Sequence, residues 1–461
     1  MAFPSNLMQV ESNLERGQPF DDLNVSFELK CSVAPKFGQM RSSSFSGISG
    51  AALSANPTLA NTNVWNGRFH DEILSEVDSP NSFKPLQNST SFPTLDHLTS
   101  SPLSSSPSEN NSTYNGLSIS PSDNTLVDST TFLNAVDVKL AGGAAGQDRA
   151  QAVCSEQNGW LYCGVYDGFS GRDAADFLAG TLYENFASEF SQSSWNNNLP
   201  ETSSSSSSSS FREDVQRCLT CALARVEDKF MTMVELEMDM RPDLVSIGSS
   251  VLAMLLHGTD LYIMNLGDSR AVLGTEMDTI RAVQLTEIHS LQNESERQRL
   301  IDDHPLDPNP IVGGRVKGIL QLTRAIGVGY LKKKEMNDKL MGILKVRNLY
   351  DPPYTYTEPF TTCHMVSETD LFVVLGSDGL YDFLPNQEVV ELVYLFIKSN
   401  PDGDPAKHLI EKILPRAAEN ACLSTEELMN VPLGDRRKFI DDVTVIVIIL
   451  GNNPKTSKAS I

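Results

Sequence analysis

The chain has 461 residues, 40% of them hydrophobic, so it is long enough for one large domain or two ordinary ones with packed cores. Its formal net charge is −23, from 36 Lys and Arg against 59 Asp and Glu, and the first 130 residues and the remainder are both acidic. This charge argues against a nucleic-acid-binding protein and against a basic patch that would bind anionic membranes.

The lack of targeting signals and the pattern of cysteines indicate the cellular compartment. No stretch approaches the ~20 apolar residues of a membrane helix, and the N-terminus lacks the pattern of a secretory signal. Seven scattered cysteines favour a reducing compartment, so we expect the cytoplasm, the nucleus or both. Cys218 and Cys221 form one C-x-x-C inside a helical pattern, where ordinary helix packing is favoured over zinc or redox chemistry.

Residues 1–130 are rich in Ser, Asn, Thr and Pro. Such a composition buries too little apolar surface to offset chain entropy, so we expect this region to be disordered. Apolar positions at Val25 to Leu29 and at Phe45 are candidates for docking onto the folded part. Four Ser-Pro pairs, which are either proline-directed phosphorylation sites or simple filler, begin at Ser79, Ser101, Ser106 and Ser120.

Apolar strands and amphipathic helices predict a folded domain over residues 131–452, followed by a tail at 453–461. The run "GWLYCGVY" at 159–166 predicts a strand, and the apolar spacing over 173–190 and 211–238 predicts two helices. The Ser-rich segment 191–210 between these helices is a low-complexity insertion. Residues 251–274 predict a three-stranded meander with turns at Gly258 and Gly267.

The second half predicts a strand at 371–377, a helix at 386–399 with Asn386 as its N-cap, and a closing strand at 443–450. Strands in meanders with pairs of helices inserted between them indicate an α+β fold, an antiparallel β-sandwich flanked by helices. A doubly wound parallel sheet would instead alternate strands and helices regularly.

Three of these apolar strands meet aspartates at their ends. Asp167-Gly168 and Asp378-Gly379 follow strands, whereas Asp441 precedes one. If the strands are antiparallel neighbours, the three carboxylates lie at one rim of a sheet. Converging carboxylates repel one another unless a cation lies between them, and oxygen ligands suit Mg²⁺ or Mn²⁺. Because Asp-Gly after a strand is also an ordinary turn signal, each instance has a second interpretation.

The motifs "GVYDG", "GSSVLAMLL", "NLGDSRAVL", "KGILQLTRAIG", "VVLGSDGLYD" and "DDVTVIVI", in this order, resemble the metal-dependent type 2C Ser/Thr protein phosphatases. The Ser-rich leader with "AGQDR" and "YDGFSG" looks most like the plant POLTERGEIST-like branch. The resemblance implies a dinuclear centre, with two Mn²⁺ or Mg²⁺ ions per subunit, at one end of the sandwich. It also implies hydrolysis of phosphoserine and phosphothreonine by a hydroxide that bridges the metals.

Carried over position by position, the resemblance implies that Asp167 bridges both metals, that Gly168 binds one through its carbonyl, and that Asp378 and Asp441 hold the other. Asp268 either contributes to a weaker third ion or caps its turn. Asp167 and Asp378 are therefore the expected catalytic residues, and Arg149 is a further candidate that suits phosphate recognition. Phosphorylated proteins are the expected substrates, and a kinase or receptor is a candidate partner.

Several positions depart from the family pattern. Phe169 stands where a histidine, the proposed general acid, is usual, and losing a general acid typically costs ~10²–10⁴ in rate. Gln147, Ile288 and Val328 stand at or near positions that are commonly acidic. The chain is therefore either a slow metal-dependent phosphatase or a catalytically inactive scaffold that binds phosphoproteins. The basic segment Arg315–Lys333 is either a flap that meets phosphopeptide beside the metals or a solvated loop.

Overall fold

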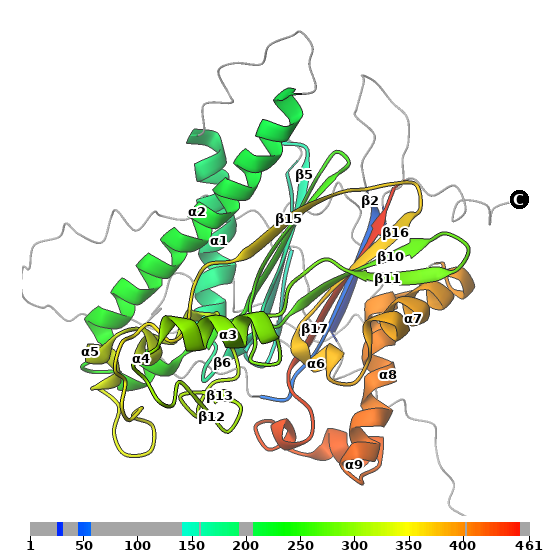
Figure 1. Ribbon diagram of the computed structural model, residues 1–461. Coiled ribbons are helices and arrows are strands. Elements are labelled where there is room, and N and C mark those ends of the chain that lie inside the picture. Colours follow the sequence, from blue (N-terminus) through cyan, green and yellow to red (C-terminus); the bar gives the residue numbers. More distant parts are fainter. Residues whose placement is uncertain are drawn as a thin grey trace, which may run out of the picture.

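Two six-stranded antiparallel sheets form the centre of the protein (Figure 1). The computed structural model describes residues 25–30, 45–56, 141–155, 158–192, 206–401 and 403–451. In spatial order the first sheet contains β1 (Val25–Lys30), β2 (Phe45–Leu53), β17 (Val443–Leu450), β16 (Asp370–Gly376), β10 (Arg270–Glu276) and β11 (Ile280–Gln284). The second contains β15 (Phe360–Met365), β9 (Asp260–Leu266), β8 (Val251–His257), β5 (Trp160–Tyr166), β4 (Asp148–Ser155) and β3 (Ala141–Ala145).

The sheets pack face to face because alternate residues of their strands are apolar on the inner side. Leu161, Cys163 and Val165 of β5 share one buried cluster with Val373 and Leu375 of β16. The intervening residues of β5 point to the opposite face, as the two-residue period of a strand requires. The apolar run of β5 therefore supplies two cores at once, which explains why it lacks a polar face.

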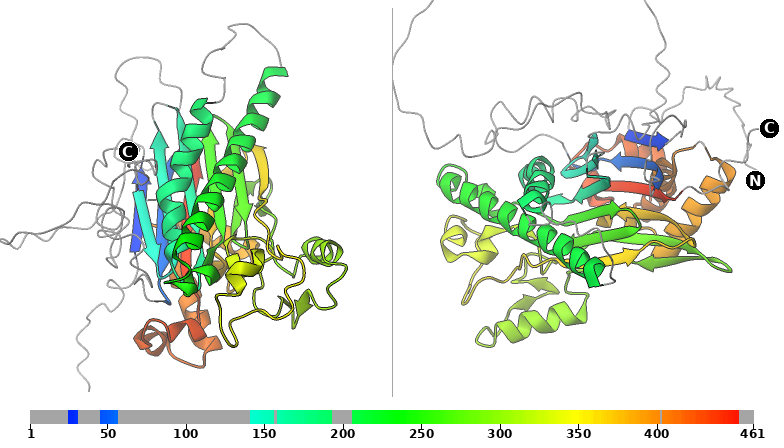
Figure 2. Two further views of the ribbon diagram at one scale, coloured as in Figure 1. Left: turned by 90° about the vertical axis from the view of Figure 1, so that its left-hand side faces the viewer. Right: turned by 90° about the horizontal axis from the view of Figure 1, so that it is seen from above.

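Helices cover the outer face of each sheet (Figures 1 and 2). α1 (Asp173–Gln192) and α2 (Ser206–Glu237) pack on the second sheet, and α7 (Asn386–Ser399) and α8 (Pro405–Asn420) pack on the first. The predicted α+β sandwich flanked by helices is confirmed. In the part of the chain that the structure describes, no helix is long and apolar enough to span a membrane.

The N-terminal region contributes to the sandwich. β2 lies between β1 and β17 and pairs with β17 from Leu53 opposite Val443 to Phe45 opposite Leu450. The predicted domain boundary at residue 131 is therefore wrong for residues 25–30 and 45–56, because they form strands of the first sheet. The candidate docking at Phe45 is confirmed. The four Ser-Pro pairs and the tail after residue 452 lie outside the described residues.

Three further predictions need correction. α1 extends to Gln192 and α2 begins at Ser206, so the insertion is shorter than 191–210, and residues 193–205 lie outside the described part. The meander is split, because β8 and β9 belong to the second sheet while β10 belongs to the first, so the chain changes sheets between β9 and β10. The N-cap of α7 is Pro385; Asn386 instead bonds Arg270 and Gln284 through its side chain.

Shorter elements gather at one end of the sandwich, the lower end in Figure 1. β6 (Gly168–Phe169), β7 (Gly248–Ser249) and β14 (Ile326–Gly327) form a small sheet. The other elements described at the periphery are α3 (Glu294–Asp303), β12 (Ile311–Val312), β13 (Arg315–Val316), α4 (Gly329–Lys332), α5 (Lys334–Asn337), α6 (Asp378–Tyr381), α9 (Thr425–Asn430) and the 3₁₀ turns Pro242–Ser246 and Arg436–Lys438.

Candidate metal centre

Three aspartates meet at this end of the sandwich. Asp167 follows β5 of the second sheet, Asp378 opens α6 after β16 of the first, and Asp268 lies where the chain crosses between β9 and β10. Each offers a carboxylate oxygen, and these oxygens lie within 4.8 Å of one another. The predicted convergence of Asp167 and Asp378 therefore occurs, but it joins two stacked sheets rather than neighbouring strands of one.

The electrostatics of these carboxylates favour a bound cation. Burial raises the pKa of Asp167 and of Asp378 well above the ordinary value, and the neighbouring aspartates raise both further. Burial raises the pKa of Asp268 to about 6. Such mutual repulsion is relieved when a cation lies between the groups, and an all-oxygen donor set suits Mg²⁺ or Mn²⁺. The residues present therefore fit a divalent metal.

Asp441 stands at the margin of this cluster. It is half-buried and is not one of the three aspartates whose oxygens lie within 4.8 Å. Its charge nevertheless raises the pKa of Asp167 and of Asp378. One of its oxygens accepts a hydrogen bond of 2.8 Å from the Asp442 N–H. Its predicted role as a metal ligand stays a prediction.

Gly168 is required by close packing. A Cβ at this position would lie 2.5 Å from the carbonyl oxygen of Gln147, which real Cβ atoms essentially never approach so closely. Because Gly168 has no side chain, the β3–β4 turn can lie directly against it. This reason is independent of the predicted carbonyl–metal bond, which stays a prediction.

Asp268 lies in the turn between β9 and β10, and its alternative roles, as a ligand of a weaker third ion or as a cap of this turn, stay predictions. It is one of the three clustered aspartates, and it accepts a hydrogen bond of 3.3 Å from the hydroxyl of Ser250, which lies between β7 and β8. The turn is held from behind by His289, whose Nδ1 accepts a hydrogen bond of 3.1 Å from the Gly267 N–H. His289 is fully buried, and burial lowers its pKa to about 3, so the neutral ring that this bond needs is maintained.

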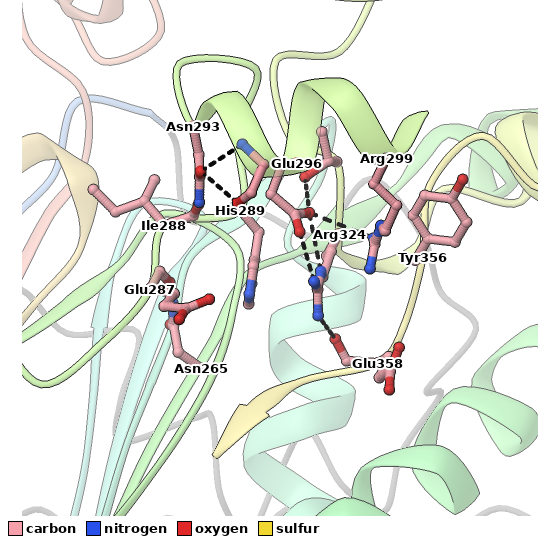
Figure 3. Close-up of polar contacts among 12 residues, drawn as sticks. Asn265, Glu287, Ile288, His289, Asn293, Glu296, Arg299, Arg324, Tyr356 and Glu358 are labelled. Atoms are coloured by element: carbon pink, nitrogen blue, oxygen red, sulfur yellow. Dashed lines mark hydrogen bonds and ion pairs between the residues drawn. The ribbon is translucent and has the colours of Figure 1, made fainter. Parts of the chain in front are cut away.

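A buried ion pair supports the segment around His289 (Figure 3). Arg324 donates two hydrogen bonds to the carboxylate of Glu296, of 3.0 and 2.5 Å, and a third of 2.7 Å to the Glu358 carbonyl. The Thr323 hydroxyl donates to the same carboxylate at 2.6 Å. Since the Thr323 N–H also donates to the His289 carbonyl at 3.0 Å, the network is tied to the turn behind Asp268.

Two acidic residues extend the cluster. Asp148 is fully buried; one of its oxygens accepts from the Thr444 hydroxyl at 2.8 Å, and the other has no hydrogen-bond partner among the described residues. Asp382, which the sequence analysis missed, lies one helical turn after Asp378, and its pKa is raised by burial and by Asp441. The four-residue spacing of Asp378 and Asp382 was the signal for that second carboxylate.

Arg149 is buried in the protein interior. Its side chain is 1% exposed, its Nε lies 2.5 Å from Asp176, and its guanidinium donates to the carbonyls of Gly146 and Asp148. These bonds order the β3–β4 turn. The predicted recognition of phosphate by Arg149 stays a prediction.

The positions that depart from the family pattern are packed in different ways. The Phe169 ring is half-buried and lies over Gly248, where a Cβ would come within 2.6 Å of it. Val328 has a φ of 55°, a left-handed conformation that is costly for a β-branched residue. Ile288 is half-buried. Gln147 donates its N–H to Asp442 at 2.9 Å, while its side-chain oxygen is buried and has no partner in the part of the chain that the structure describes.

The basic segment Arg315–Lys333 is anchored beside this centre. Its β14 pairs with β7, which pairs with β6, so it lies two strands from Gly168 and Phe169. Two of its lysines are held internally: Lys317 bonds Asp307 at 2.7 Å, and Lys332 bonds Glu227 at 2.5 Å. A wholly solvated loop is therefore wrong for this segment, and its predicted contact with phosphopeptide stays a prediction.

Comparisons with known proteins identify the family. The family model described as Protein phosphatase 2C matches residues 134–423. "Probable protein phosphatase 2C 39" of Oryza sativa subsp. japonica is 53% identical over 446 residues, covering 90% of this chain and 86% of that protein. "Probable protein phosphatase 2C 40" of Arabidopsis thaliana is 47% identical over 493 residues, covering 97% and 99%. Among solved structures, the serine-threonine phosphatase 2C from Toxoplasma gondii aligns at 15% identity with a TM-score of 0.49, covering 68% of this chain and 95% of that chain.

Proposed function

Because the chain belongs to the protein phosphatase 2C family and is thus a protein-serine/threonine phosphatase, we propose that its aspartate cluster is the active centre and holds two Mn²⁺ or Mg²⁺ ions. The observation that carries this proposal is the meeting of Asp167, Asp268 and Asp378 from three separate strand ends within 4.8 Å. The plant origin of both relatives is consistent with the predicted branch.

When bound, such ions supply a hydroxide nucleophile at neutral pH and neutralise charge on the phosphoryl oxygens. The chain's own contribution is to hold the carboxylates in place before substrate arrives. Asp167 and Asp378 are rigidly placed because each adjoins a buried strand, and Asp268 is fixed by the turn that His289 supports. A metal site whose ligands are already held in place needs no reorganisation when the substrate arrives.

The test is release of phosphate from a phosphothreonine peptide by the full chain, with Mn²⁺, with Mg²⁺ and with EDTA. The full chain is needed because β2 belongs to the sandwich. We expect metal-dependent release by the wild type and none by Asp167→Asn or Asp378→Ala. Asp228→Ala, which removes an exposed carboxylate on α2, is the matched control and should behave as the wild type. Full activity in both cluster variants would refute the proposal.

A phosphoprotein-binding scaffold is the second candidate, and Phe169 is the observation that favours it. Phenylalanine cannot donate a proton, and its ring packs over Gly248 instead of forming a polar contact. A scaffold would bind a phosphopeptide tightly while neither the wild type nor Phe169→His releases phosphate. Any Mn²⁺-dependent release that is lost in Asp378→Ala would exclude it.

A further inference from the structure

The carboxylate of Asp442, next to the predicted ligand Asp441, is a buried junction of four hydrogen bonds. The Asp442 side chain accepts from the N–H of Ala55 at 2.6 Å and from the N–H of Asn56 at 2.9 Å. It also accepts from the Asn56 side-chain amide at 2.8 Å and from the Gln147 N–H at 2.9 Å. Three of its four donors therefore come from a segment 386 or 387 residues away in the sequence.

Asp442 is linked directly to Asp441 and to the chain neighbour of Asp378, and through Gln147 it is linked to Gly168, the neighbour of Asp167. Its N–H donates to the Asp441 carboxylate at 2.8 Å. Its carbonyl presses on Gly379, the residue after Asp378, where a Cβ would come within 2.3 Å. Its side chain accepts a hydrogen bond from the N–H of Gln147, the residue before Asp148. The carbonyl of Gln147 in turn lies against Gly168. A shift of Asp442 would therefore displace the chain beside Asp167, Asp378 and Asp441.

The segment Ser54–Asn56, which follows β2, is itself clamped on its other side. The Ser54 carbonyl accepts from Arg436 at 2.9 Å, and the Ala55 carbonyl accepts from the Gly434 N–H at 2.7 Å. The Ser54 hydroxyl accepts from the Gly146 N–H at 2.9 Å. Ala55 is fully buried and Asn56 is 5% exposed, so water does not compete for these bonds.

The turn residue Gly146 shows how closely these parts fit. It has a φ of 55°, and a Cβ there would lie 2.2 Å from one oxygen of Asp442. Only glycine allows the β3–β4 turn to reach the Asp442 carboxylate in this conformation. The turn, the segment after β2 and the start of β17 thus form one interlocked unit behind the aspartate cluster.

We propose that Asn56 and Asp442 are positioning residues for the metal centre, so that the centre is completed only when the segment after β2 docks against the start of β17. This proposal rests on the proposed function, since it assumes that the aspartate cluster binds metal. It makes part of the N-terminal region, which is joined to β3 by residues 57–140, a component of the catalytic domain. Partners that support metal ligands from behind typically change metal affinity 10–100-fold when they are mutated.

If Asn56 and Asp442 only stabilised the fold, their variants would show a different pattern of stability and metal affinity. A buried carboxylate with four donors stabilises the fold whether or not a metal is bound, so losing a donor would lower stability without a specific effect on metal binding. A matched control is available in β2 itself. The Ser49 hydroxyl donates to Asp404 at 2.5 Å and accepts from the Ala406 N–H at 3.1 Å, which anchors β2 to the start of α8, away from Asp442.

The experiment measures Mn²⁺ binding to the full chain by titration calorimetry, together with thermal unfolding in EDTA. Asn56→Asp places a second carboxylate where a donor now faces Asp442, and we expect Mn²⁺ to bind roughly 10–100-fold more weakly. Asn56→Ala removes one donor without adding a charge, and we expect about a tenfold loss. Ser49→Ala should lower the unfolding midpoint while its Mn²⁺ affinity stays within about twofold of the wild type.

The outcomes separate the two proposals. Unchanged Mn²⁺ affinity in both Asn56 variants would overturn the positioning role, as would an equal loss in Ser49→Ala at equal stability. Should Asn56→Asp fail to fold, Asn56→Ala against Ser49→Ala decides the question. Asp378→Ala is measured in parallel: if it binds Mn²⁺ as the wild type does, the proposed metal centre itself is refuted, whatever the Asn56 variants show.

Discussion

Removing the charge of Asp268 should stabilise the metal-free protein. The pKa of this carboxyl is raised from 3.8 to about 6, chiefly by burial. A raised pKa means that the folded state binds the proton more tightly than the unfolded state. The contribution of Asp268 to the free energy of unfolding is therefore fully present below pH 3.8. It is lost as the pH rises to about 6 and stays absent at higher pH. Asparagine resembles the protonated carboxyl, so Asp268→Asn removes the cost of ionisation at neutral pH.

The size of the effect follows from the shift. The rise from 3.8 to about 6 is roughly two units, and one unit corresponds to about 1.4 kcal/mol. This sets an upper bound of about 3 kcal/mol. Because Asp268 is only half-buried, solvent screening reduces the value, and we expect about 1–2 kcal/mol at pH 8 in EDTA. The gain should disappear near pH 4, and saturating Mn²⁺ should reverse the order by stabilising the wild type more.

Urea denaturation of both proteins at pH 8 and pH 4, with EDTA or Mn²⁺, measures this difference. Asp307→Asn is the matched control, and its stability should change in the opposite direction. Burial alone would raise the pKa of Asp307, but hydrogen bonds from Lys317 and Tyr354 outweigh it and lower the pKa, so this variant should be less stable than the wild type at pH 8. If Asp268→Asn is no more stable than the wild type in EDTA at pH 8, burial does not impose the expected cost on this carboxylate.

Three further predictions concern the surroundings of the centre. Gly168→Ala places a Cβ 2.5 Å from the Gln147 carbonyl, so we expect Mn²⁺ affinity by calorimetry to fall about tenfold; unchanged affinity would contradict the packing argument. Glu296→Gln breaks the paired hydrogen bonds with Arg324 and should lower the free energy of unfolding in urea by ~3 kcal/mol, a loss that a solvent-screened pair would not show. Phe169→His should raise the rate of phosphate release ~10²-fold or more if a missing general acid limits the wild type, and no increase would disprove that cause.

Local pattern was sufficient for several of the longest elements. The helix predicted at 386–399 and the strand predicted at 443–450 coincide with α7 and β17, because the first has apolar residues at helical spacing and the second is a short, continuous apolar run. The motif order likewise predicted the family, which the family model and the plant relatives confirm. The pairing of Asp167 with Asp378 was also foreseen, since each aspartate ends an apolar strand.

The sequence by itself therefore determined several of the long strands and helices, the aspartates at the ends of three strands, and the family to which the chain belongs. Only the tertiary structure decided that the aspartates approach from two different sheets, that Arg149 points inward to Asp176, and that β2 lies beside β17. It alone placed Asn56 against Asp442, across 386 positions of the chain. Strand and helix propensities are local, whereas the pairing of distant segments depends on which buried faces and hydrogen-bonding groups the rest of the fold leaves open.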